Sequence, residues 1–381
     1  MIYPAPVWSE IDLDALGYNV RQLRNATDTK AELMAVVKAD AYGHGAKETA
    51  ATALKYGASW LGVARVSEGI ALRQAGIEAP ILVLGYTVRE ELPLLLAYEL
   101  IQTVFNLNFA EELAAVASRA AKKALVHIKV DTGMGRLGFL PDSYGVRDMV
   151  KLAGLNHLDV QGIFTHFAAS DSADKSYTNM QWRKFIQLLE LLHHKGLSFL
   201  CRHAANSAAL LDMPETHLDM VRAGIALYGV KPSSELVNQQ VKLKPVMSVK
   251  SKIAQIKKVS AGCGISYGTT YITPAQTRVA TIPAGYADGY NRLLSSKGEV
   301  LICGKRAPVI GRVCMDQFMA DVGHIPEAEP GAEVVLLGKQ GEEAITADEI
   351  AAKIDTIAYE VLCAVNSRRV VRNFISTHKV V

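Results

Sequence analysis

Eight short runs rich in β-branched and apolar residues alternate with helix-forming segments over the first two-thirds of the chain. This alternation limits the possible folds more than any other feature, because it favours parallel strands joined by right-handed helical crossovers. An open doubly wound sheet is the alternative, but it does not require eight such units, whereas a (β/α)8 barrel does. The sequence therefore predicts an α/β fold that begins with a (β/α)8 barrel. The expected strands are residues 33–38, 60–65, 81–84, 100–105, 125–130, 160–165, 199–203 and 219–222.

The pattern changes near Pro232, after which polar residues at 238–240 indicate a connection. Strand-like runs separated by glycine and proline turns then follow, with two helical stretches near the end. We predict a barrel domain at residues 9–235, entered through a helix at 11–24, and a mostly β C-terminal domain at 236–381, with residues 1–8 as an optional part of the second. The expected elements of the second domain are strands at 247–256, 277–283, 299–303, 307–310, 318–322 and 333–337, and helices at 347–352 and 358–364.

Charge and composition exclude several classes of function. The 381 residues carry a net charge of only +3, which gives no basic surface for nucleic acid or an anionic membrane. The first residues, Met1–Pro6, lack the pattern of a secretory signal, and no apolar run reaches the roughly 20 residues of a membrane-spanning helix. The five cysteines show no metal-binding spacing. We expect a cytoplasmic globular protein without a metal site.

Lys38 ends the first predicted strand, where an apolar run gives way to small residues and glycines at 39–45. A lysine at the carboxyl end of a buried strand loses hydration, which lowers the pKa of its amine and favours a Schiff base with a carbonyl. The alternative is a lysine that extends its ammonium group into solvent. The small residues favour the first interpretation, because they let a ligand approach the backbone closely.

Other chemically reactive residues also follow predicted strands. In a barrel the active site lies at the carboxyl ends of the strands, with phosphate often bound after strands 7 and 8. The Ser207 hydroxyl and the amides of Gly224 and Ile225 would form an anion cradle there. A Schiff-base lysine beside such a cradle indicates pyridoxal phosphate (PLP) or a phosphorylated carbonyl substrate. Taken alone, each residue would more often be structural, and their shared position favours function. The group is Lys38, Lys129, Arg136, His166, Asn206, Ser207, Arg222, Gly224 and Ile225.

One motif suggests a different cofactor. Residues 133–138 match G-x-G-x-x-G after a strand. A dinucleotide site needs its helix to open within the glycine run and an acidic residue at the end of the next strand. Here Pro141 separates the run from the next helix, and Asp159 precedes its strand. We therefore reject NAD binding.

Six segments together resemble bacterial alanine racemases. The resemblance runs in order from Trp8 to beyond Tyr359 and covers essentially the whole chain. The matching segments are 36–45, 127–136, 222–229, 265–268, 285–289 and 311–316.

The resemblance implies an alanine racemase that interconverts L- and D-alanine and supplies D-alanine for peptidoglycan. Lys38 would hold PLP as an internal aldimine and act as one base. Tyr267 of the partner subunit of a homodimer would act as the opposite base, since racemisation exchanges a proton on both faces of a planar carbon. Arg222 would face the pyridine nitrogen, and His166 would link it to Tyr267 of the partner subunit. An arginine there keeps the ring a weak electron sink, which disfavours transamination.

The resemblance also implies roles for the remaining candidates. Arg136 and the partner subunit's Met315 would hold the substrate carboxylate, and Lys129 would be a carbamylation site, with a plain amine beside a bound anion as the alternative. Tyr286 and Tyr359 would form an entrance gate that favours small side chains. The residues implied around the phosphate are Tyr42, Asn206, Ser207, Gly224, Ile225 and Tyr359.

Three other kinds of protein share part of this pattern. PLP decarboxylases of basic amino acids have the two-domain plan but place a carboxylate at the pyridine nitrogen, where this chain has Arg222. PLP-carrier proteins resemble the barrel alone, whereas this chain continues into a domain with Tyr267 and Met315. A PLP-free Schiff-base aldolase would be colourless. Serine in place of alanine remains the nearest alternative substrate.

Overall fold

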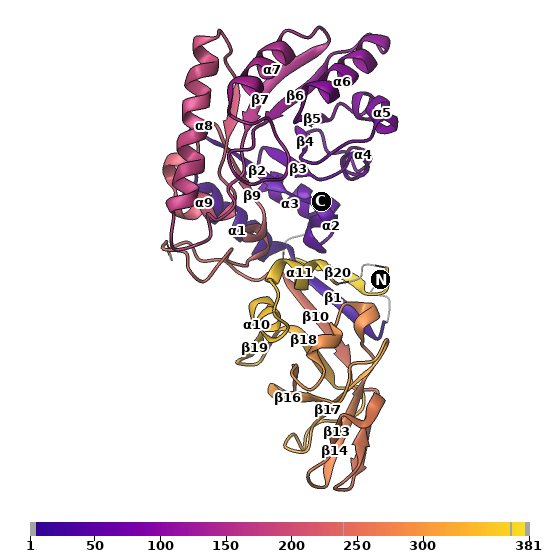
Figure 1. Cartoon of the computed structure of the whole chain (residues 1–381). Helices are drawn as coiled ribbons and strands as arrows, with labels where there is room; N and C mark the ends of the chain where they lie inside the picture. Colours follow the sequence, from indigo (N-terminus) through magenta and orange to yellow (C-terminus); the bar gives the residue numbers. More distant parts are fainter. Residues whose placement is uncertain (1–4, 239, 366–367, 378–381) are drawn as a thin grey trace. The chain divides into compact units, whose positions relative to one another are not determined.

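The structure is a computed structural model that describes residues 5–238, 240–365 and 368–377, so Gln239 of the predicted connection lies outside the described residues. The chain divides into two compact units (Figure 1). The barrel unit comprises Leu16–Ala41 and Ala46–Lys244. The β-rich unit comprises the residues up to Ala15, Tyr42–Gly45 and the residues from Pro245 onward.

The barrel unit contains one sheet of eight parallel strands in the order β8-β7-β6-β5-β4-β3-β2-β9. Two hydrogen bonds of 3.0 Å join the ends of this order, next to β8 and β9: the Asp219 amide donates to the Arg202 carbonyl, and the Arg222 amide donates to the Ala205 carbonyl. The sheet therefore forms a nearly closed barrel. The predicted (β/α)8 architecture is confirmed. The strands are β2 (Glu32–Val36), β3 (Trp60–Val63), β4 (Ile81–Val83), β5 (Ile101–Val104), β6 (Ala124–Lys129), β7 (Leu158–Phe164), β8 (Cys201–His203) and β9 (Met220–Ala223).

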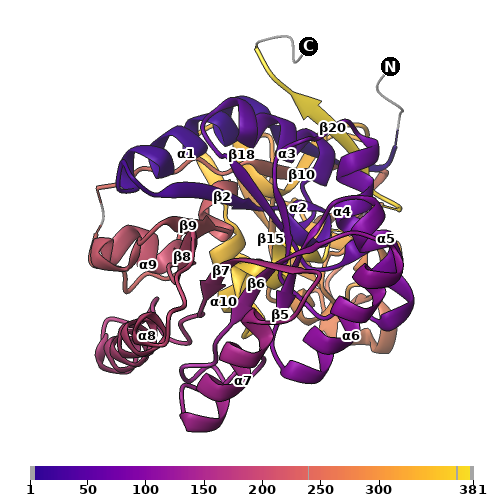
Figure 2. The ribbon, with the colours of Figure 1, turned by 90° about the horizontal axis from the view of Figure 1, so that it is seen from above.

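The helices of this unit lie outside its strands (Figure 2). In α6, Phe109, Leu113 and Ala117 repeat at helical spacing and are buried, so one face packs inward. Helix α7 begins at a capping residue, Asp142, whose carboxylate accepts from the Gly145 amide at 2.8 Å. The helices are α1 (Leu13–Ala26), α3 (Ala46–Lys55), α4 (Val66–Gln74), α5 (Leu92–Ala97), α6 (Leu107–Arg119), α7 (Ser143–Ala153), α8 (Ser176–His194) and α9 (Ser207–Asp212).

The β-rich unit contains a ten-stranded sheet whose main path is β11-β14-β17-β16-β15-β18-β10-β1-β20, with β19 paired to β18. A mostly β second domain is therefore confirmed. Two short strands, β12 and β13, form a separate hairpin. The elements are β1 (Val7–Asp12), β10 (Met247–Lys252), β11 (Gln255–Val259), β12 (Gly264–Ile265), β13 (Tyr271–Ile272), β14 (Thr277–Ile282), β15 (Glu299–Ile302), β16 (Lys305–Ile310), β17 (Phe318–Asp321), β18 (Glu333–Gln340), β19 (Glu343–Ile345), β20 (Val371–Ile375), α10 (Ala347–Lys353) and α11 (Ala358–Cys363).

Two predicted elements are wrong in detail. The expected single strand at 247–256 is two strands, because β10 pairs with β18 and β11 with β14, and the chain changes partner at Ile253 and Ala254. The expected helix at 11–24 begins at Leu13 instead, because Ile11 and Asp12 belong to β1. Strand β1 pairs antiparallel with β10 and parallel with β20.

Among the residues that the structure describes, no helix combines the length and the apolar character needed to cross a membrane.

Candidate functional site

Lys38 lies at the carboxyl end of β2 and opens a short left-handed turn, α2 (Lys38–Tyr42). The residues Ala39–Tyr42 all have φ between 52 and 55°. Each residue with a Cβ in this region is disfavoured by about 1–2 kcal/mol, so contacts must hold the turn. One such contact is a hydrogen bond of 2.7 Å from the Ala39 amide to the Glu68 carboxylate. The turn therefore fixes the backbone that carries Lys38.

Lys129 ends β6 and is buried. Its ammonium group donates to the Val130 carbonyl at 2.7 Å and lies 5.4 Å from the ring centre of Phe164. It forms no ion pair with a carboxylate of the described residues. Burial, with help from the nearby Arg222, lowers the pKa of this amine to about 7. A substantial fraction of Lys129 is therefore neutral near pH 7.

The loop after β6 carries Arg136 and folds around the carboxylate of Asp131. This carboxylate accepts hydrogen bonds of 2.8–3.1 Å from the amides of residues 133–136. Although partial burial acts to raise the pKa of Asp131, these backbone bonds bring it below its ordinary value. The glycine run thus wraps a side chain of the protein itself, and helix α7 begins only at Ser143. Arg136 lies at the exposed end of the loop.

Arg222 lies in β9 and is buried. Its Nη1 donates to His203 Nδ1 at 2.9 Å, and its Nη2 approaches the Thr165 and Ala204 carbonyls at 2.9 Å and His166 Nδ1 at 3.1 Å. Burial lowers the pKa of the guanidinium to about 9, so it remains charged at neutral pH. No carboxylate of the described residues forms an ion pair with it.

His166 follows β7 by two residues and accepts the hydrogen bond from Arg222 at Nδ1. Burial of the ring and then the charge of Arg222 hold the pKa of His166 well below its ordinary value, with smaller contributions from Arg136, Lys129 and Lys38. A neutral ring that accepts at Nδ1 carries its proton on Nε2. Four cationic side chains therefore act on His166 at one end of the barrel, and such a concentration of positive charge favours an anion.

Two residues of the predicted cradle, Ser207 and Gly224, are hydrogen-bonded to each other. The Ser207 hydroxyl oxygen accepts from the Gly224 amide at 2.8 Å and approaches the Ala226 amide at 3.5 Å, so its proton is available to donate to another acceptor. Ile225 opens the 3₁₀ turn η3 (Ile225–Tyr228) directly after Gly224. The cap of α9 is Asn206, whose side-chain oxygen accepts from two amides at 3.1 Å, and not Ser207.

Five further candidates lie in the β-rich unit. The rings of Tyr42 and Tyr359 are 6.1 Å apart, and burial raises the pKa of Tyr42. Tyr286 and Met315 come together because two neighbouring amides, those of Tyr286 and Ala287, donate to the carbonyls of Cys314 and Met315 at 3.1 and 3.0 Å.

Tyr267 follows β12 on a loop of the same unit. The loop is tied down by the Ser266 hydroxyl, which donates to the Arg312 carbonyl at 2.7 Å. Tyr267 is 73% exposed, Met315 53% and Tyr286 42%.

Sequence reasoning did not identify three residues that shape the site. Asp131 lies inside a matched segment, so its motif could have revealed its role. Glu68 supports the turn after Lys38 from a distant helix, and no local pattern predicts that contact. For His203 the sequence offers one signal, namely that it shares a predicted strand with Cys201, two residues earlier.

Two family models match the chain. The model described as alanine racemase, N-terminal domain, matches residues 11–232, and the one described as alanine racemase, C-terminal domain, matches residues 246–374.

Related proteins agree with this result. The alanine racemase of Desulforamulus reducens is 50% identical over 363 residues, which is 95% of this chain and 97% of that protein. The structure of alanine racemase from Clostridium difficile 630 superposes with a TM-score of 0.95 at 41% identity and covers 100% of this chain and 98% of its own. A Bartonella henselae alanine racemase, described with covalently bound pyridoxal phosphate, has a TM-score of 0.87 at 28% identity, with 98% and 100% coverage.

Proposed function

The chain belongs to the alanine racemase family, and we propose that it interconverts L-alanine and D-alanine with PLP and supplies D-alanine for peptidoglycan. The observation that carries this proposal is the group of cationic side chains at the carboxyl end of the barrel. Lys129 and Arg222 are buried there, and no carboxylate of residues 5–238, 240–365 or 368–377 forms an ion pair with either; Lys38 and Arg136 contribute to the same electrostatic field. This environment suits a phosphate and an amino-acid carboxylate together.

The residues present fit PLP. The Ser207 hydroxyl has a proton to donate to a phosphate, and the short loop at Gly224 and Ile225 lies directly beside it. We propose that Tyr42, Asn206 and Tyr359 complete phosphate binding and that Lys38 holds the cofactor covalently. When bound, PLP withdraws electrons from the substrate Cα and so makes its proton acidic.

The residues of this chain would then move the proton. Lys38 acts as a base on one face of Cα, and Tyr267 of the partner subunit acts on the other. A tyrosine is a weak base at its ordinary pKa of about 10, so it needs a neighbour to help. His166, with its proton on Nε2 and Nδ1 bonded to Arg222, would connect that tyrosine to the arginine.

Arg222 limits the side reactions. In every hydrogen bond that the structure shows for it, the Arg222 guanidinium is the donor. Because it also remains charged at neutral pH, it does not readily give up a proton to a pyridine nitrogen. Because an unprotonated pyridine is the weaker electron sink, little negative charge is stored on the ring. This restraint favours return of the proton to Cα over transamination.

We assign substrate binding to Arg136 and the partner subunit's Met315, and the entrance gate to Tyr286 and Tyr359. The lowered pKa of Lys129 supports its carbamylation, since a neutral amine is the form that reacts with carbon dioxide.

We also propose a cytoplasmic homodimer with shared active sites, because the exposed Tyr267 and Met315 would find their function against a second subunit. The proposed functional domains are the PLP-binding barrel, predicted at residues 9–235, and the β-rich domain, predicted at 236–381, which would complete the partner's site. Residues 9–15 lie in the β-rich unit and residues 236–244 in the barrel unit, so these predicted bounds differ from those of the compact units.

The test is to add L-alanine to the purified, PLP-loaded protein and to follow optical activity by circular dichroism. We expect the signal to decay to zero and D-alanine to reach the same end point, whereas Lys38→Ala should leave both signals unchanged. An unchanged signal with wild-type protein that visibly holds PLP would overturn the proposed function. A parallel reaction with L-serine would measure how narrow the substrate range is.

A further inference from the structure

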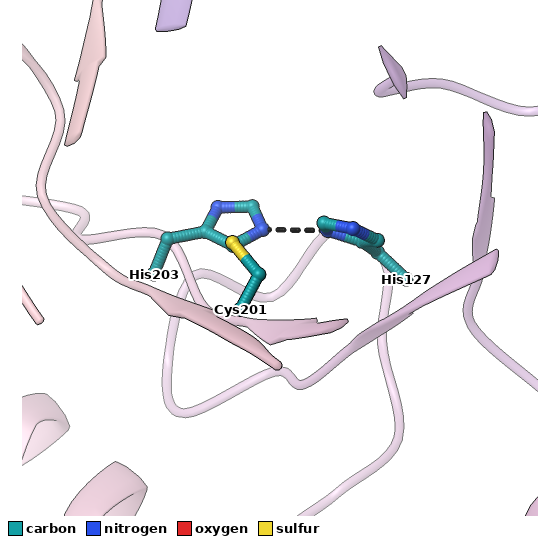
Figure 3. Close-up of side chains that lie close together, drawn as sticks. All are labelled: His127, Cys201 and His203. Carbon is teal, nitrogen blue, oxygen red and sulfur yellow. Dashed lines mark hydrogen bonds between the residues drawn. The ribbon is translucent and has the colours of Figure 1, made fainter. Parts of the chain in front are cut away.

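A second group of reactive side chains lies in the barrel next to Arg222, to which one of its members, His203, is hydrogen-bonded. His127 on β6 and Cys201 and His203 on β8 meet there, although 76 residues separate the two histidines in the sequence (Figure 3). His127 Nδ1 and His203 Nε2 are 2.9 Å apart, and both rings are buried. The proposed chemistry uses neither histidine directly.

The hydrogen bonds determine where each ring carries its proton. Arg222 cannot accept a hydrogen bond, so its Nη1 donates to His203 Nδ1, which must be unprotonated. Burial keeps the pKa of His203 well below its ordinary value and lowers that of His127 to about 3, so both rings are neutral. His203 therefore carries its proton on Nε2 and donates it to His127 Nδ1. His127 in turn carries its proton on Nε2.

The surroundings hold both rings in place. His203 stacks on Phe164 with ring centres 4.6 Å apart and an angle of 6° between the planes. His127 lies 5.5 Å from the ring centre of Trp60. It also fills the space above Gly162, where a Cβ atom would come within 2.6 Å of the His127 ring. The position is thus built for an imidazole.

This arrangement also has a cost in stability. His127 Nε2 is buried and has no hydrogen-bond partner among the residues that the structure describes. A buried donor without a partner destabilises a fold. Retaining a histidine here therefore suggests a role for its other nitrogen, Nδ1.

A metal site is the obvious alternative, since one ligand atom from each of the three side chains lies within 4.8 Å of the others. However, His203 Nε2 would have to lose its proton, which would move to Nδ1 and face the Arg222 donor. Burial raises the pKa of the Cys201 thiol to about 12, so the thiolate that a metal requires is disfavoured. The charge of Arg222 would also repel a cation.

We propose that His127 is a positioning residue that acts through His203 on Arg222. By accepting a hydrogen bond from His203 Nε2, His127 stabilises the His203 tautomer that Arg222 requires, in which Nδ1 accepts from Nη1, and this bond orients the guanidinium. That the orientation of Arg222 matters for the cofactor rests on the proposed function. The preference for this tautomer is a property of the protein chain itself.

The test compares His127→Leu with His127→Asn. Leucine removes the acceptor and leaves the buried Nε2–H of His203 without a partner, which makes this tautomer less stable. The His203 ring should then release Arg222 and carry part of its proton on Nδ1. The asparagine side-chain oxygen can take the place of His127 Nδ1 and should keep the wild-type tautomer. NMR of protein with ¹⁵N-labelled histidine reports which ring nitrogen carries the proton, and His203→Gln identifies the signals of His203.

In wild type and His127→Asn we expect a protonated Nε2 and an unprotonated Nδ1 at His203, and in His127→Leu loss of this pattern. In PLP-loaded protein His127→Leu should shift the visible absorbance maximum and lower kcat at least tenfold, with KM changed less. His127→Asn should restore most of both.

His217→Leu is the matched control. His217 is another buried histidine of the barrel unit, with bonds of 3.1 Å from the Asp28 amide and 3.0 Å to the Leu210 carbonyl. This variant should lower the melting temperature and leave the absorbance maximum unchanged.

An unchanged His203 tautomer in folded His127→Leu would overturn the proposal. Two other results would also overturn it. One is an equal loss of kcat in His127→Leu and His127→Asn when both variants melt cooperatively, and the other is a shift of the visible absorbance maximum in His217→Leu. The two proposals can fail separately. If wild-type protein does not racemise alanine, the proposed function fails. If His127→Leu is then still the one variant that changes the His203 tautomer, the role of His127 is upheld.

Discussion

The two units carry their candidate site residues in opposite ways. In the barrel unit Lys129 and Arg222 are buried, and hydrogen bonds to carbonyls and to imidazoles fix their direction. In the β-rich unit Tyr267 and Met315 stand on loops and are more than half exposed. The barrel therefore fixes its charged side chains in place, whereas the β-rich unit leaves Tyr267 and Met315 open to solvent.

This difference indicates a division of labour. A buried cation is expensive, so we infer that Arg222, and Lys129 in its charged form, bind or stabilise negative charge. An exposed tyrosine has an ordinary environment until something covers it. Experiments can therefore ask whether activity depends on a finished barrel, on a second subunit, or on both.

The largest effect should come from Lys38. Lys38→Ala should lower racemisation at least about 10³-fold and abolish the PLP absorbance that survives dialysis, because the amine would both hold the cofactor and move a proton. Circular dichroism with alanine and absorbance after dialysis measure the two effects. Lys30→Ala, which alters an exposed lysine, should leave both unchanged. Covalent PLP in Lys38→Ala would assign the cofactor to another lysine.

Mixing two inactive variants tests whether the units of different subunits work together. If Tyr267 serves the partner's barrel, a heterodimer of Lys38→Ala and Tyr267→Ala has one intact site. Random exchange at equal concentrations then restores roughly a quarter of wild-type activity. Activity after exchange, with heterodimer verified by tagged subunits, measures this. If each barrel uses its own Tyr267, verified heterodimers stay inactive.

Arginines of the two units should differ in what they contribute to stability. Arg222→Gln removes a buried charge and leaves acceptors at His203, Thr165 and Ala204 unpaired, so we expect a loss of about 2–4 kcal/mol in the free energy of unfolding. Arg278→Gln, in the β-rich unit, removes bonds to the Ile325 and Ala328 carbonyls at a partly exposed site, for about 1 kcal/mol. Urea unfolding measures both. Equal losses would show that burial is not what distinguishes the units.

At neutral pH the smallest effect comes from Lys129, which should make the stability depend on pH. Its folded pKa of about 7 lies below the ordinary 10.5, so between these values the unfolded chain binds more protons than the folded one. The free energy of unfolding of wild type relative to Lys129→Met should therefore rise with pH in this window, by at most about 1.4 kcal/mol per unit, and stay flat below pH 7.

Urea unfolding in bicarbonate-free buffer at several pH values measures this slope. Lys123→Met, which alters an exposed lysine, should follow wild type throughout. A slope that does not change in Lys129→Met would place the responsible group elsewhere. A slope that disappears when bicarbonate is added would indicate carbamylation of Lys129, which ¹³C-bicarbonate NMR detects directly.

The barrel was predictable because its information is local. Each strand is a short apolar run, each helix has its own period, and the carboxyl ends of parallel strands share one face. Lys38, Lys129, His166 and Arg222 were therefore expected in one region before any contact was known. Their chemical roles remain predictions from the resemblance.

Other features depend on partners far away in the chain. The break at Ile253 and Ala254 arises because β10 and β11 pair with different strands, which the continuous apolar pattern does not reveal. The left-handed turn after Lys38 relies on Glu68, and the His203 tautomer relies on His127. Such contacts follow from the closed fold and not from local propensity.

The position of β1 between β10 and β20 has a consequence for how the protein is made. This strand is made before both of its neighbours, and the second of them, β20, ends at Ile375. At about 5–20 residues per second, translation of the intervening residues takes roughly 20–70 s. The barrel sequence is complete well before then. We therefore expect newly made chains to close the barrel first and one edge of β1 to remain unpaired, open to chaperones or to unwanted pairing, until β20 has been made.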